Sequence, residues 1–453
     1  MLHRTPLHRR RFFELLAGAG LLSSAGLLPG LLRASTPTIT DRYFVFAYFQ
    51  GGWDMLLGLD PRNPDDFPAR LASETGIDPA YNTIVGLAPE DFLVDTAVDG
   101  MTFGPYIGDM ADHAHRLAVV RGLAGESVAH EVARRHALTG IRPAGSSVRA
   151  SSVATLLAFL LGQNEPIPNL VCGLDSFNVG HPSWAAGLTT ETVEDLYQAL
   201  SPGGTAVSAG SRAALEAFFA EQESNTSSAM LQEIYTNRRT ARGIVDLGIA
   251  DLFDLESSTG DMTAMREAFG VDSGATGPGG PRALMAAQAL TQGVARCVSF
   301  AAAQNLDTHQ GADWQTEAGP LQRQGWDSVA ALAAWLASTP FGDGQSWLDH
   351  TTIVCMSEFT REPVLNSSGG RDHHIVGTMA LLGGGIQGGQ VVGATSDHGM
   401  LSQPVDLHTG AVSAAGELVT HAHIARTLLQ SIGIDDDIGD YRAPPVAALL
   451  EEA

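Results

Sequence analysis

Acidic and histidine side chains follow three apolar stretches of this chain. Asp307 and His309 come after the run CVSFAAA, and Glu358 comes after TTIVCM. A third run, YFVFAYF, is followed by a glycine pair and then Asp54. Because divalent metals are held in proteins by carboxylate oxygens and imidazole nitrogens, this recurring placement indicates a metal site. The candidate ligands are Asp54, Asp307, His309, Glu358, Asp372 and His373.

Each candidate also has an ordinary structural interpretation. Asp307 and His309 are two residues apart, so both side chains share one face if the chain is extended there. That spacing suits a Zn, Mn or Fe ligand pair, but an Asp-Thr-His turn also forms for structural reasons alone. Glu358 is alternatively the ion-pair partner of Arg361. Asp54 is alternatively the cap of a helix that begins at the next residue, and Asp-His-His after Gly-Arg is alternatively a surface turn.

The apolar runs must position these residues, and they predict strands that are covered on both faces. Ligands in an open α/β sheet gather at the carboxyl ends of the strands. Strands that alternate with helices indicate an α/β fold, here a three-layer α/β/α sandwich with a mainly parallel sheet. Strands are predicted at 43–49, 117–121, 169–173, 297–303, 351–356, 378–382 and 390–393, and helices at 148–162, 282–295, 317–338 and 420–432.

Residues 175–280 have a different pattern. TTETVEDLYQAL, SRAALEAFFAEQE and SSAMLQEIYTNRRTARGIVDLGIADLF are amphipathic and are joined by loose polar connections. We expect this region to be a helical insertion, or a cap, over one side of the sheet. The insertion belongs to a single α/β domain that spans 41–453.

The N-terminus has the pattern of an export signal. HRRRFF, at 8–13, precedes a short apolar stretch that Gly, Ser and Pro29 interrupt. Twin arginines before such a stretch are typical of a Tat-type signal peptide, here 1–35. We therefore expect the Tat export machinery as a partner and a periplasmic or secreted location. The alternatives are an uncleaved anchor and a basic leader with no export role. No later stretch predicts a stable membrane span.

Composition limits the partners of the chain. The net charge is −24 at pH 7, and all 26 basic residues are arginine. Nucleic acids and anionic membranes require a basic face on the protein, so both are disfavoured. Cys172, Cys297 and Cys355 lie in apolar runs without CxxC spacing, which predicts small buried side chains rather than disulfides or a zinc knuckle.

Five motifs occur in the order RRRFF, FQGGWD, NLDTHQ, MSEFTREPVLNSSGGRDHH and LLGGGIQGGQVVG. In that order they resemble the secreted family called domain of unknown function 1501, which is similar in fold to the alkaline phosphatase and sulfatase superfamily. The resemblance covers most of 41–437. It implies a site for two metal ions. The residues that stand at the implied ligand positions are Asp54, Asp307, His309, Glu358, Asp372 and His373.

The chain departs from the superfamily pattern in three places. It has Asp-x-His where the superfamily has Asp-x-x-x-His, and Ser-Glu where the superfamily has Asp-His. Relatives tend to have Ser-His where this chain has Ala129 and His130, which leaves Ser127 or a metal-bound water as the nucleophile. His130 is either a site residue or a satisfied histidine at a helix start. Arg361 either binds an anionic oxygen in a fork or pairs with a neighbouring glutamate.

The resemblance and the candidate ligands together predict a hydrolase of phosphate or sulfate esters. The enzyme would use one or two divalent ions (Zn, Mn, Ca or Mg), with Ser127, His130 and Arg361 as catalytic residues. Its partner would be a small anionic ester or a cell-surface polymer. The alternative is a non-catalytic secreted or surface binding protein on the same fold, with a degenerate metal site. The cost of burying unpaired carboxylates without a cation favours the hydrolase.

Overall fold

The computed structural model describes residues 41–201, 208–342 and 344–451, so the expected signal peptide at 1–35 lies outside the described residues. Eight strands form the main sheet. They are β1 (Tyr43–Phe49), β4 (Leu117–Ala124), β5 (Asn169–Cys172), β6 (Leu188–Thr190), β7 (Cys297–Ala303), β8 (Thr351–Met356), β11 (Val376–Gly383) and β12 (Gln390–Val392). Two short ribbons pair β2 (Val94–Asp95) with β3 (Thr102–Phe103) and β9 (Thr360–Arg361) with β10 (His373–His374).

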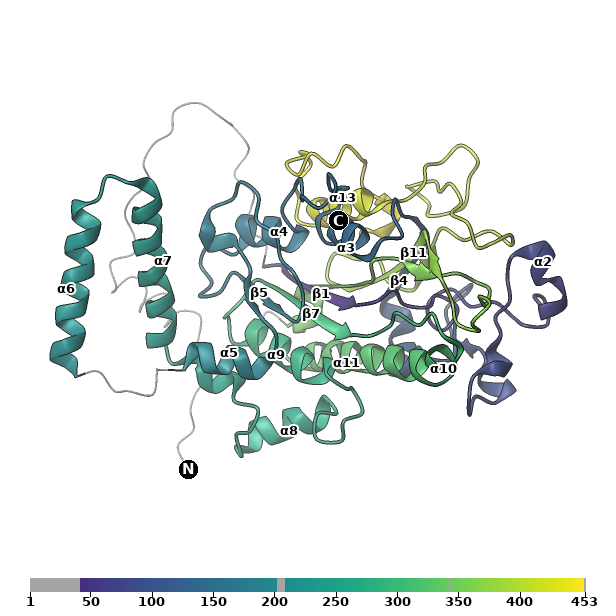
Figure 1. Cartoon of the computed structure of the whole chain (residues 1–453), viewed down its shortest axis with the longest axis horizontal. Coiled ribbons are helices and arrows are strands. Elements are labelled where there is room, and N and C mark those ends of the chain that lie inside the picture. The colour runs from purple at the N-terminus through teal and green to yellow at the C-terminus, as the bar shows by residue number, and fades with distance from the viewer. Residues whose placement is uncertain (1–40, 202–207, 343, 452–453) are drawn as a thin grey trace.

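The order of the strands in the sheet is β12-β4-β11-β8-β1-β7-β5-β6 (Figure 1). β11 runs antiparallel to both β4 and β8, whereas the other neighbouring pairs are parallel. The predicted α/β class and mainly parallel sheet are therefore confirmed. β8, β1 and β7 are adjacent and parallel, so the three strands that precede the candidate ligands end at the same edge of the sheet.

Helices cover both faces of this sheet (Figure 1). The longer helices are α3 (His130–Thr139), α4 (Val153–Leu161), α5 (Val193–Leu200), α6 (Ala209–Asn225), α7 (Ala229–Asp246), α8 (Gly260–Ala268), α9 (Gly279–Thr291), α11 (Gly319–Ser338) and α13 (His421–Gln430). Three helices of one turn are α2 (Ala72–Thr75), α10 (Gly311–Asp313) and α12 (Trp347–His350).

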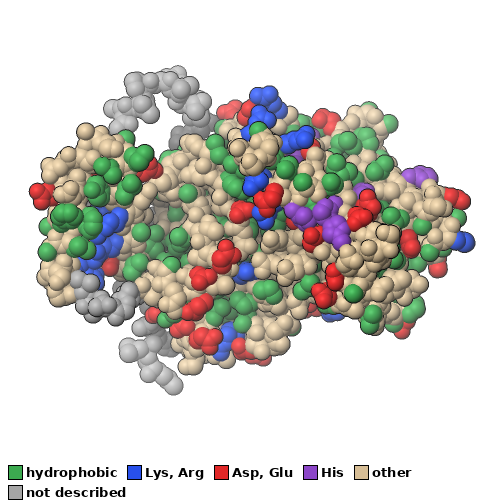
Figure 2. All heavy atoms as spheres, viewed as in Figure 1, with side chains coloured by type: hydrophobic (Ala, Val, Ile, Leu, Met, Phe, Trp, Pro, Cys, Tyr) green, Lys and Arg blue, Asp and Glu red, His purple; other side chains and the backbone are tan. Residues whose placement is uncertain are grey.

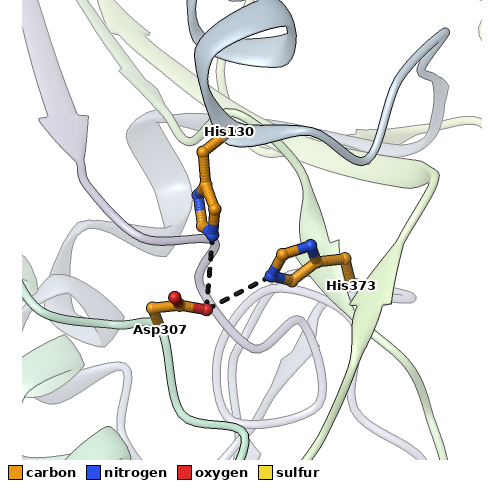
Figure 3. A group of neighbouring side chains, drawn as sticks. All are labelled: His130, Asp307 and His373. Carbon is orange, nitrogen blue, oxygen red and sulfur yellow. Dashed lines mark hydrogen bonds and ion pairs between the residues drawn. The ribbon is translucent and has the colours of Figure 1, made fainter.

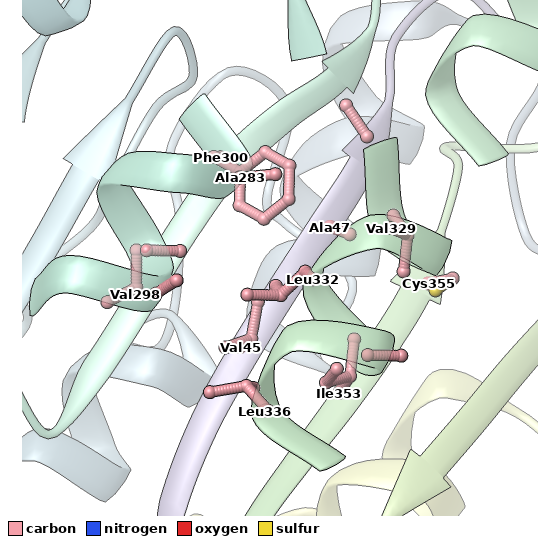
Figure 4. Packing of buried hydrophobic residues seen from close by; sticks show 14 of the residues in the cluster. Val45, Ala47, Ala283, Val298, Phe300, Val329, Leu332, Leu336, Ile353 and Cys355 are labelled. Carbon is pink, nitrogen blue, oxygen red and sulfur yellow. The ribbon is translucent and has the colours of Figure 1, made fainter. Parts of the chain in front are cut away.

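The core explains why the strands are apolar throughout. Along β1, Val45 and Ala47 face the side covered by α9 and α11, where they pack with residues such as Leu332 (Figure 4). Phe44 and Phe46, between them in sequence, belong to a second cluster on the side of α4 and α13. A strand with helices on both faces has no side that water can reach, so alternation of polar and apolar residues disappears. The three cysteines are buried and free, as expected.

Several predicted boundaries match the structure closely. The strands expected at 43–49, 297–303 and 351–356 have those bounds. The helix expected at 148–162 begins later, at Val153. Just before it, the hydroxyls of Ser151 and Ser152 accept hydrogen bonds from the backbone N–H groups of Val179 and Phe177. Serine side chains that bond to a distant backbone in this way compete with helix formation.

The region 175–280 supplies both helices and an edge strand. β6, within this range, extends the sheet beyond β5. α6 and α7 form a hairpin that stands at one end of the molecule, away from the sheet (Figure 1). Their contact includes an ion pair between Arg242 and Glu216 at 2.5 Å. Among the described residues, no helix has the length and apolar character needed to cross a membrane.

Candidate metal centre

Glycine at position 51 brings the ends of β1 and β7 together. Gly51 has a φ of +111°, and a Cβ atom there would lie 2.6 Å from the backbone nitrogen of Leu306. A side chain at this position would clash with that backbone and would also strain its own. The Gly51 turn therefore packs directly against the segment that carries Asp307.

Three imidazole rings converge on one oxygen of Asp307. The Nε2 atoms of His309, His373 and His130 lie 3.0, 3.2 and 3.3 Å from Asp307 Oδ1. Figure 3 shows two of these rings pointing at the carboxylate from different elements. His130 is the first residue of α3, and His373 belongs to β10. Figure 2 shows histidine side chains gathered beside acidic ones on one face of the molecule.

Each of these rings is held through its other nitrogen. The Nδ1–H of His130 donates to Glu358 Oε1 at 2.9 Å, and that of His309 donates to Asp372 Oδ1 at 2.7 Å. The Nδ1–H of His373 donates to the carbonyl of Val128 at 2.8 Å. With the proton on Nδ1, the lone pair of each ring lies on Nε2, toward Asp307. Metal-binding histidines in proteins are usually oriented in this way.

The distance between two of these rings gives a further constraint. His309 Nε2 and His373 Nε2 are 2.8 Å apart. Two nitrogen lone pairs at that separation repel each other unless a proton or a cation is shared between them. Burial lowers the pKa of His373, with Asp307 opposing the shift. The neutral ring is therefore favoured, which makes a cation the better match to this contact.

Glu358 contacts the site through His130, at the ring nitrogen that does not face Asp307. It is buried, and its carboxylate accepts hydrogen bonds from the hydroxyl of Tyr48 at 2.9 Å and the N–H of Gly51 at 2.8 Å. Burial alone raises the pKa of Glu358, but the hydrogen bonds from His130 and its other donors outweigh burial and leave the pKa below its ordinary value. The ionised Glu358 in turn raises the pKa of His130. Glu358 thus orients the ring of His130 and increases its basicity.

Arg361 is the positive charge already present in the site. Its side chain is fully buried, and Nη2 lies 2.6 Å from Asp307 Oδ1. The other donors of this guanidinium bond to the backbone carbonyls of Gly51, Gly52 and Arg371. Partial burial raises the pKa of Asp307, but the hydrogen bond and the positive charge of Arg361 outweigh burial and hold the pKa well below its usual range. Arg361 therefore keeps Asp307 ionised and has little free capacity for an anionic substrate.

The short ribbon of β9 and β10 explains how Arg361 and His373 come together. The two residues are directly paired across the antiparallel strands. The loop that joins these strands holds the remaining histidine, because the side-chain amide of Asn366 donates to the carbonyl of His309 at 3.0 Å and to Asp372 at 2.9 Å. One stretch of chain thus supplies the arginine, one imidazole and the support for another.

The donor set fits a metal ion. His130, Asp307 and His373 each offer one ligand atom, and those atoms all lie within 4.8 Å of one another. His130 Nε2 is buried and faces Asp307 Oδ1 at 3.3 Å, a distance at which a cation held between the two atoms would suit both. His309 Nε2 lies close enough to be a further donor. Two or three imidazoles with one carboxylate suit Zn or a similar transition metal better than Mg or Ca.

Two of the candidate residues lie outside this group. Asp54 is buried, where its carboxylate accepts from the backbone N–H of Leu56 and from Trp314 Nε1, each at 2.9 Å, and pairs with Arg371 at 3.1 Å. Ser127 lies in the loop before α3, and its hydroxyl accepts from the N–H of Ala129 at 3.1 Å. Within the described ranges, no recorded contact joins either residue to Asp307.

The sequence reasoning missed the residues that support the histidines. Tyr48, the Val128 carbonyl and Asn366 are all hydrogen-bonded to site residues, and the ring of Phe359 packs against His130 and His373 with centroids 4.8 and 4.4 Å away. A tyrosine near the end of an apolar strand was a usable signal for one of them, because a buried hydroxyl needs a polar partner. A backbone acceptor such as the Val128 carbonyl cannot be predicted from residue types, because every residue has a backbone carbonyl.

Comparison with curated proteins gave no match. A family model does match, over residues 48–437, which include every residue of the site described above. The chain therefore belongs to the family described as Protein of unknown function (DUF1501).

Proposed function

We propose that this protein is a Tat-exported, metal-dependent hydrolase of phosphate or sulfate esters, built on an alkaline phosphatase-like fold. The observation that carries the proposal is the convergence of three imidazole Nε2 atoms on Asp307 Oδ1, with every Nδ1 held by an acceptor. Such an arrangement has a cost without a cation, because it faces the lone pairs of His309 and His373 toward each other at 2.8 Å.

The proposed ligands are His130, Asp307 and His373, with His309 as the fourth donor. This assigns to His130 the role of a ligand rather than that of an acid or base. One cation is proposed rather than two, because the carboxylate of Asp54 is already occupied by Arg371 and Trp314. Imidazole-rich sites favour Zn among the candidate ions.

The contacts of each residue indicate its role in the proposed reaction. A bound divalent cation supplies Lewis acidity, which stabilises negative charge on an ester oxygen. Glu358 and Asp372 accept from Nδ1 of His130 and His309, which orients each ring with Nε2 toward the proposed cation, and Arg361 keeps Asp307 ionised. Ser127, three residues before His130, remains the candidate nucleophile of this chain. The half-exposed carboxylate of Asp307 leaves room for a small anionic ester to approach.

Arg361 also favours a second candidate function, a binding protein on the same fold without catalysis. Its guanidinium already neutralises Asp307 at 2.6 Å, which weakens the pull of that carboxylate on a metal ion. In this case the site serves recognition of a small anionic ester or a cell-surface polymer. The two candidate functions use the same site and differ only in whether the bound ester is hydrolysed.

The two candidates are separated by a hydrolysis assay on the exported full chain. An aryl phosphate and an aryl sulfate are supplied with added Zn or Mn, beside His373→Gln and Asp307→Asn. His408→Gln, at an exposed histidine outside the site, is the matched control. The hydrolase proposal expects turnover in the parent and the control and its loss in both site variants. Metal binding without turnover of either ester class would leave the binding protein as the better account.

A further inference from the structure

A second cavity lies between the C-terminal end of α3 and the N-terminal end of α13. Its volume is about 280 Å³, near the lower end for small-molecule sites. Its wall includes His136, Thr420 and Tyr441, and its rim includes three arginines. His130 and His136 lie on the same helix, six residues or roughly 9 Å of helix rise apart, so this cavity is distinct from the candidate metal centre.

One buried histidine, His136, lines this cavity, and a second, His421, packs behind it. The ring of His136 is only 4 % exposed, lines the cavity and makes no recorded hydrogen bond to another described residue. It packs against His421 with ring centroids 4.8 Å apart, and both ring nitrogens of His421 are buried without a partner. Burial lowers the pKa of both rings, so both are neutral in the free protein. Unpartnered polar groups are uncommon in folded proteins and call for an explanation.

The charges at the rim are those of an anion site. Arg142 pairs loosely with Glu126 at 3.6 Å, and both side chains are exposed. Arg442 pairs with the neighbouring Asp440 at 2.9 Å. Arg149 makes no ion pair within 4 Å among the described residues, although its charge acts on Asp440. Asp437 bonds to the backbone of Tyr441 and Arg442, so the three arginines face three acids near the cavity. Arginine side chains at the rim of a cleft nevertheless attract anions, and their forks donate to oxyanions.

The first turn of α13 adds backbone donors. Thr420, which caps this ten-residue helix, and Ala422, in its first turn, both line the cavity. The N-terminus of a helix carries free N–H groups and a partial positive charge that favour anions. Arginine forks, helix N–H groups and a neutral imidazole N–H are all donors, which matches an oxyanion with several acceptor oxygens.

We propose that this cavity binds a small oxyanion such as phosphate, held by the arginine rim, the first turn of α13 and His136. The site is independent of the proposed metal centre and holds whether or not that centre is catalytic. It gives the ring of His136 an acceptor, and it engages the guanidinium of Arg149, which makes no recorded hydrogen bond among the described residues.

Calorimetric titration with inorganic phosphate tests the proposal without relying on activity. The full chain is used with Asp307→Asn and His373→Gln in the background and with chelator present, so that the metal centre takes no part. One set of variants is Arg142→Gln/Arg149→Gln/Arg442→Gln, which removes the rim. Its matched control is Arg212→Gln/Arg239→Gln/Arg323→Gln, which removes the same net charge from half-exposed arginines elsewhere.

One equivalent of phosphate is expected in the parent and in the control. Loss of several charge-assisted hydrogen bonds should weaken binding roughly tenfold or more in the rim variant. His136→Phe keeps the ring shape and removes its nitrogens. It should weaken binding in the same direction and leave the thermal midpoint unchanged or higher, because a buried polar group is replaced by an apolar one. Absence of phosphate binding in the parent, or equal weakening in rim and control variants, overturns the proposal.

Discussion

Asp54 and Asp307 follow neighbouring strands of one sheet, and each lies beside a fully buried arginine. The carboxylate of Asp54 is 2 % exposed and pairs with Arg371, whereas that of Asp307 is 48 % exposed and pairs with Arg361. The Asp54 carboxylate also accepts hydrogen bonds from the indole N–H of Trp314 and the backbone N–H of Leu56. Asp307 instead faces three imidazoles.

Both acids follow an apolar strand, but they differ in the groups that surround their carboxylates. Every contact of Asp54 comes from a group that cannot bind a metal, and burial excludes any further partner. Around Asp307 the imidazole lone pairs are directed inward, and the carboxylate stays open to solvent. An acid beyond an apolar strand thus becomes either a structural ion pair or a candidate ligand, according to what the rest of the chain places beside it.

The largest expected effect is on stability, at Asp54. Asp54→Asn keeps the size of the side chain but leaves the buried charge of Arg371 without its counter-ion. We expect a loss of about 3 kcal/mol in the free energy of unfolding, the lower end for a broken buried pair, because backbone carbonyls still bond to Arg371. Denaturant unfolding measures this loss. Asp397→Asn, at an exposed acid, should change stability little, and an equal loss in both variants would contradict the distinction.

The next effect is on metal affinity, at Glu358. Glu358→Gln removes the negative charge that fixes and polarises the ring of His130, without touching a proposed ligand atom. Losses of roughly 10–100-fold in affinity are typical when such supporting residues are changed. Competition with a chelating dye on the purified variant measures the affinity. Unchanged affinity, with the fold intact by circular dichroism, would remove His130 from the proposed ligand set.

A smaller change in affinity is expected at Asp372. Its side chain is half exposed, and its hydrogen bonds to His309 and Asn366 compete with water. Hydrogen bonds from these two residues lower the pKa of Asp372, so the group is ionised at neutral pH. Asp372→Asn should therefore weaken metal binding less than Glu358→Gln does in the same dye assay. The reverse order would show that His309, rather than His130, is the principal imidazole ligand.

The smallest effect concerns the pH dependence of stability in metal-free protein. The hydrogen bond and the positive charge of Arg361 outweigh the effect of burial and hold the pKa of Asp307 below its ordinary value of about 3.9. A depressed carboxyl pKa adds stability above the unfolded-state pKa, and that stability is lost as pH falls through the folded-state pKa. The difference between the parent and Asp307→Asn should thus be largest near neutral pH and shrink below about pH 4.

Solvent exposure limits the size of this effect. Because the carboxylate is half exposed, the contribution should stay below about 1 kcal/mol. Urea unfolding of both proteins across this pH range measures it. A difference that grows toward acid pH has the wrong sign and would contradict the ion pair between Asp307 and Arg361.

The fold class and the central strands could be predicted from the sequence. The different surroundings of Asp54 and Asp307 could not. β1, β7 and β8 have the expected bounds because a run of apolar, β-branched and aromatic residues has few alternatives in a sheet covered on both faces. The antiparallel direction of β11 was not expected, since residue types do not encode strand direction. The predicted helix begins late, at Val153 rather than at 148, where Ser151 and Ser152 bond to a loop that lies 25 to 28 residues further along the chain.

Most of the acids and histidines near Asp307 were selected from their types and placement, but the contacts that join them were not predicted. Asp54 and Arg371 are 317 residues apart, and nothing in either local sequence pairs them. His130 was expected in a catalytic role, yet its ring occupies the same centre as His373. The support from Tyr48 and from the Val128 carbonyl depends on tertiary contacts that no local pattern records.

Metal content tests the central claim most directly. The exported full chain is purified without chelator, and its metal is measured by plasma mass spectrometry beside His130→Gln, Asp307→Asn and Asp54→Asn. About one equivalent is expected in the parent and in folded Asp54→Asn, and a small fraction of that in the other two variants. A folded parent that stays metal-free after incubation with Zn and Mn, or a loss of metal in Asp54→Asn alone, would contradict the proposed centre at Asp307.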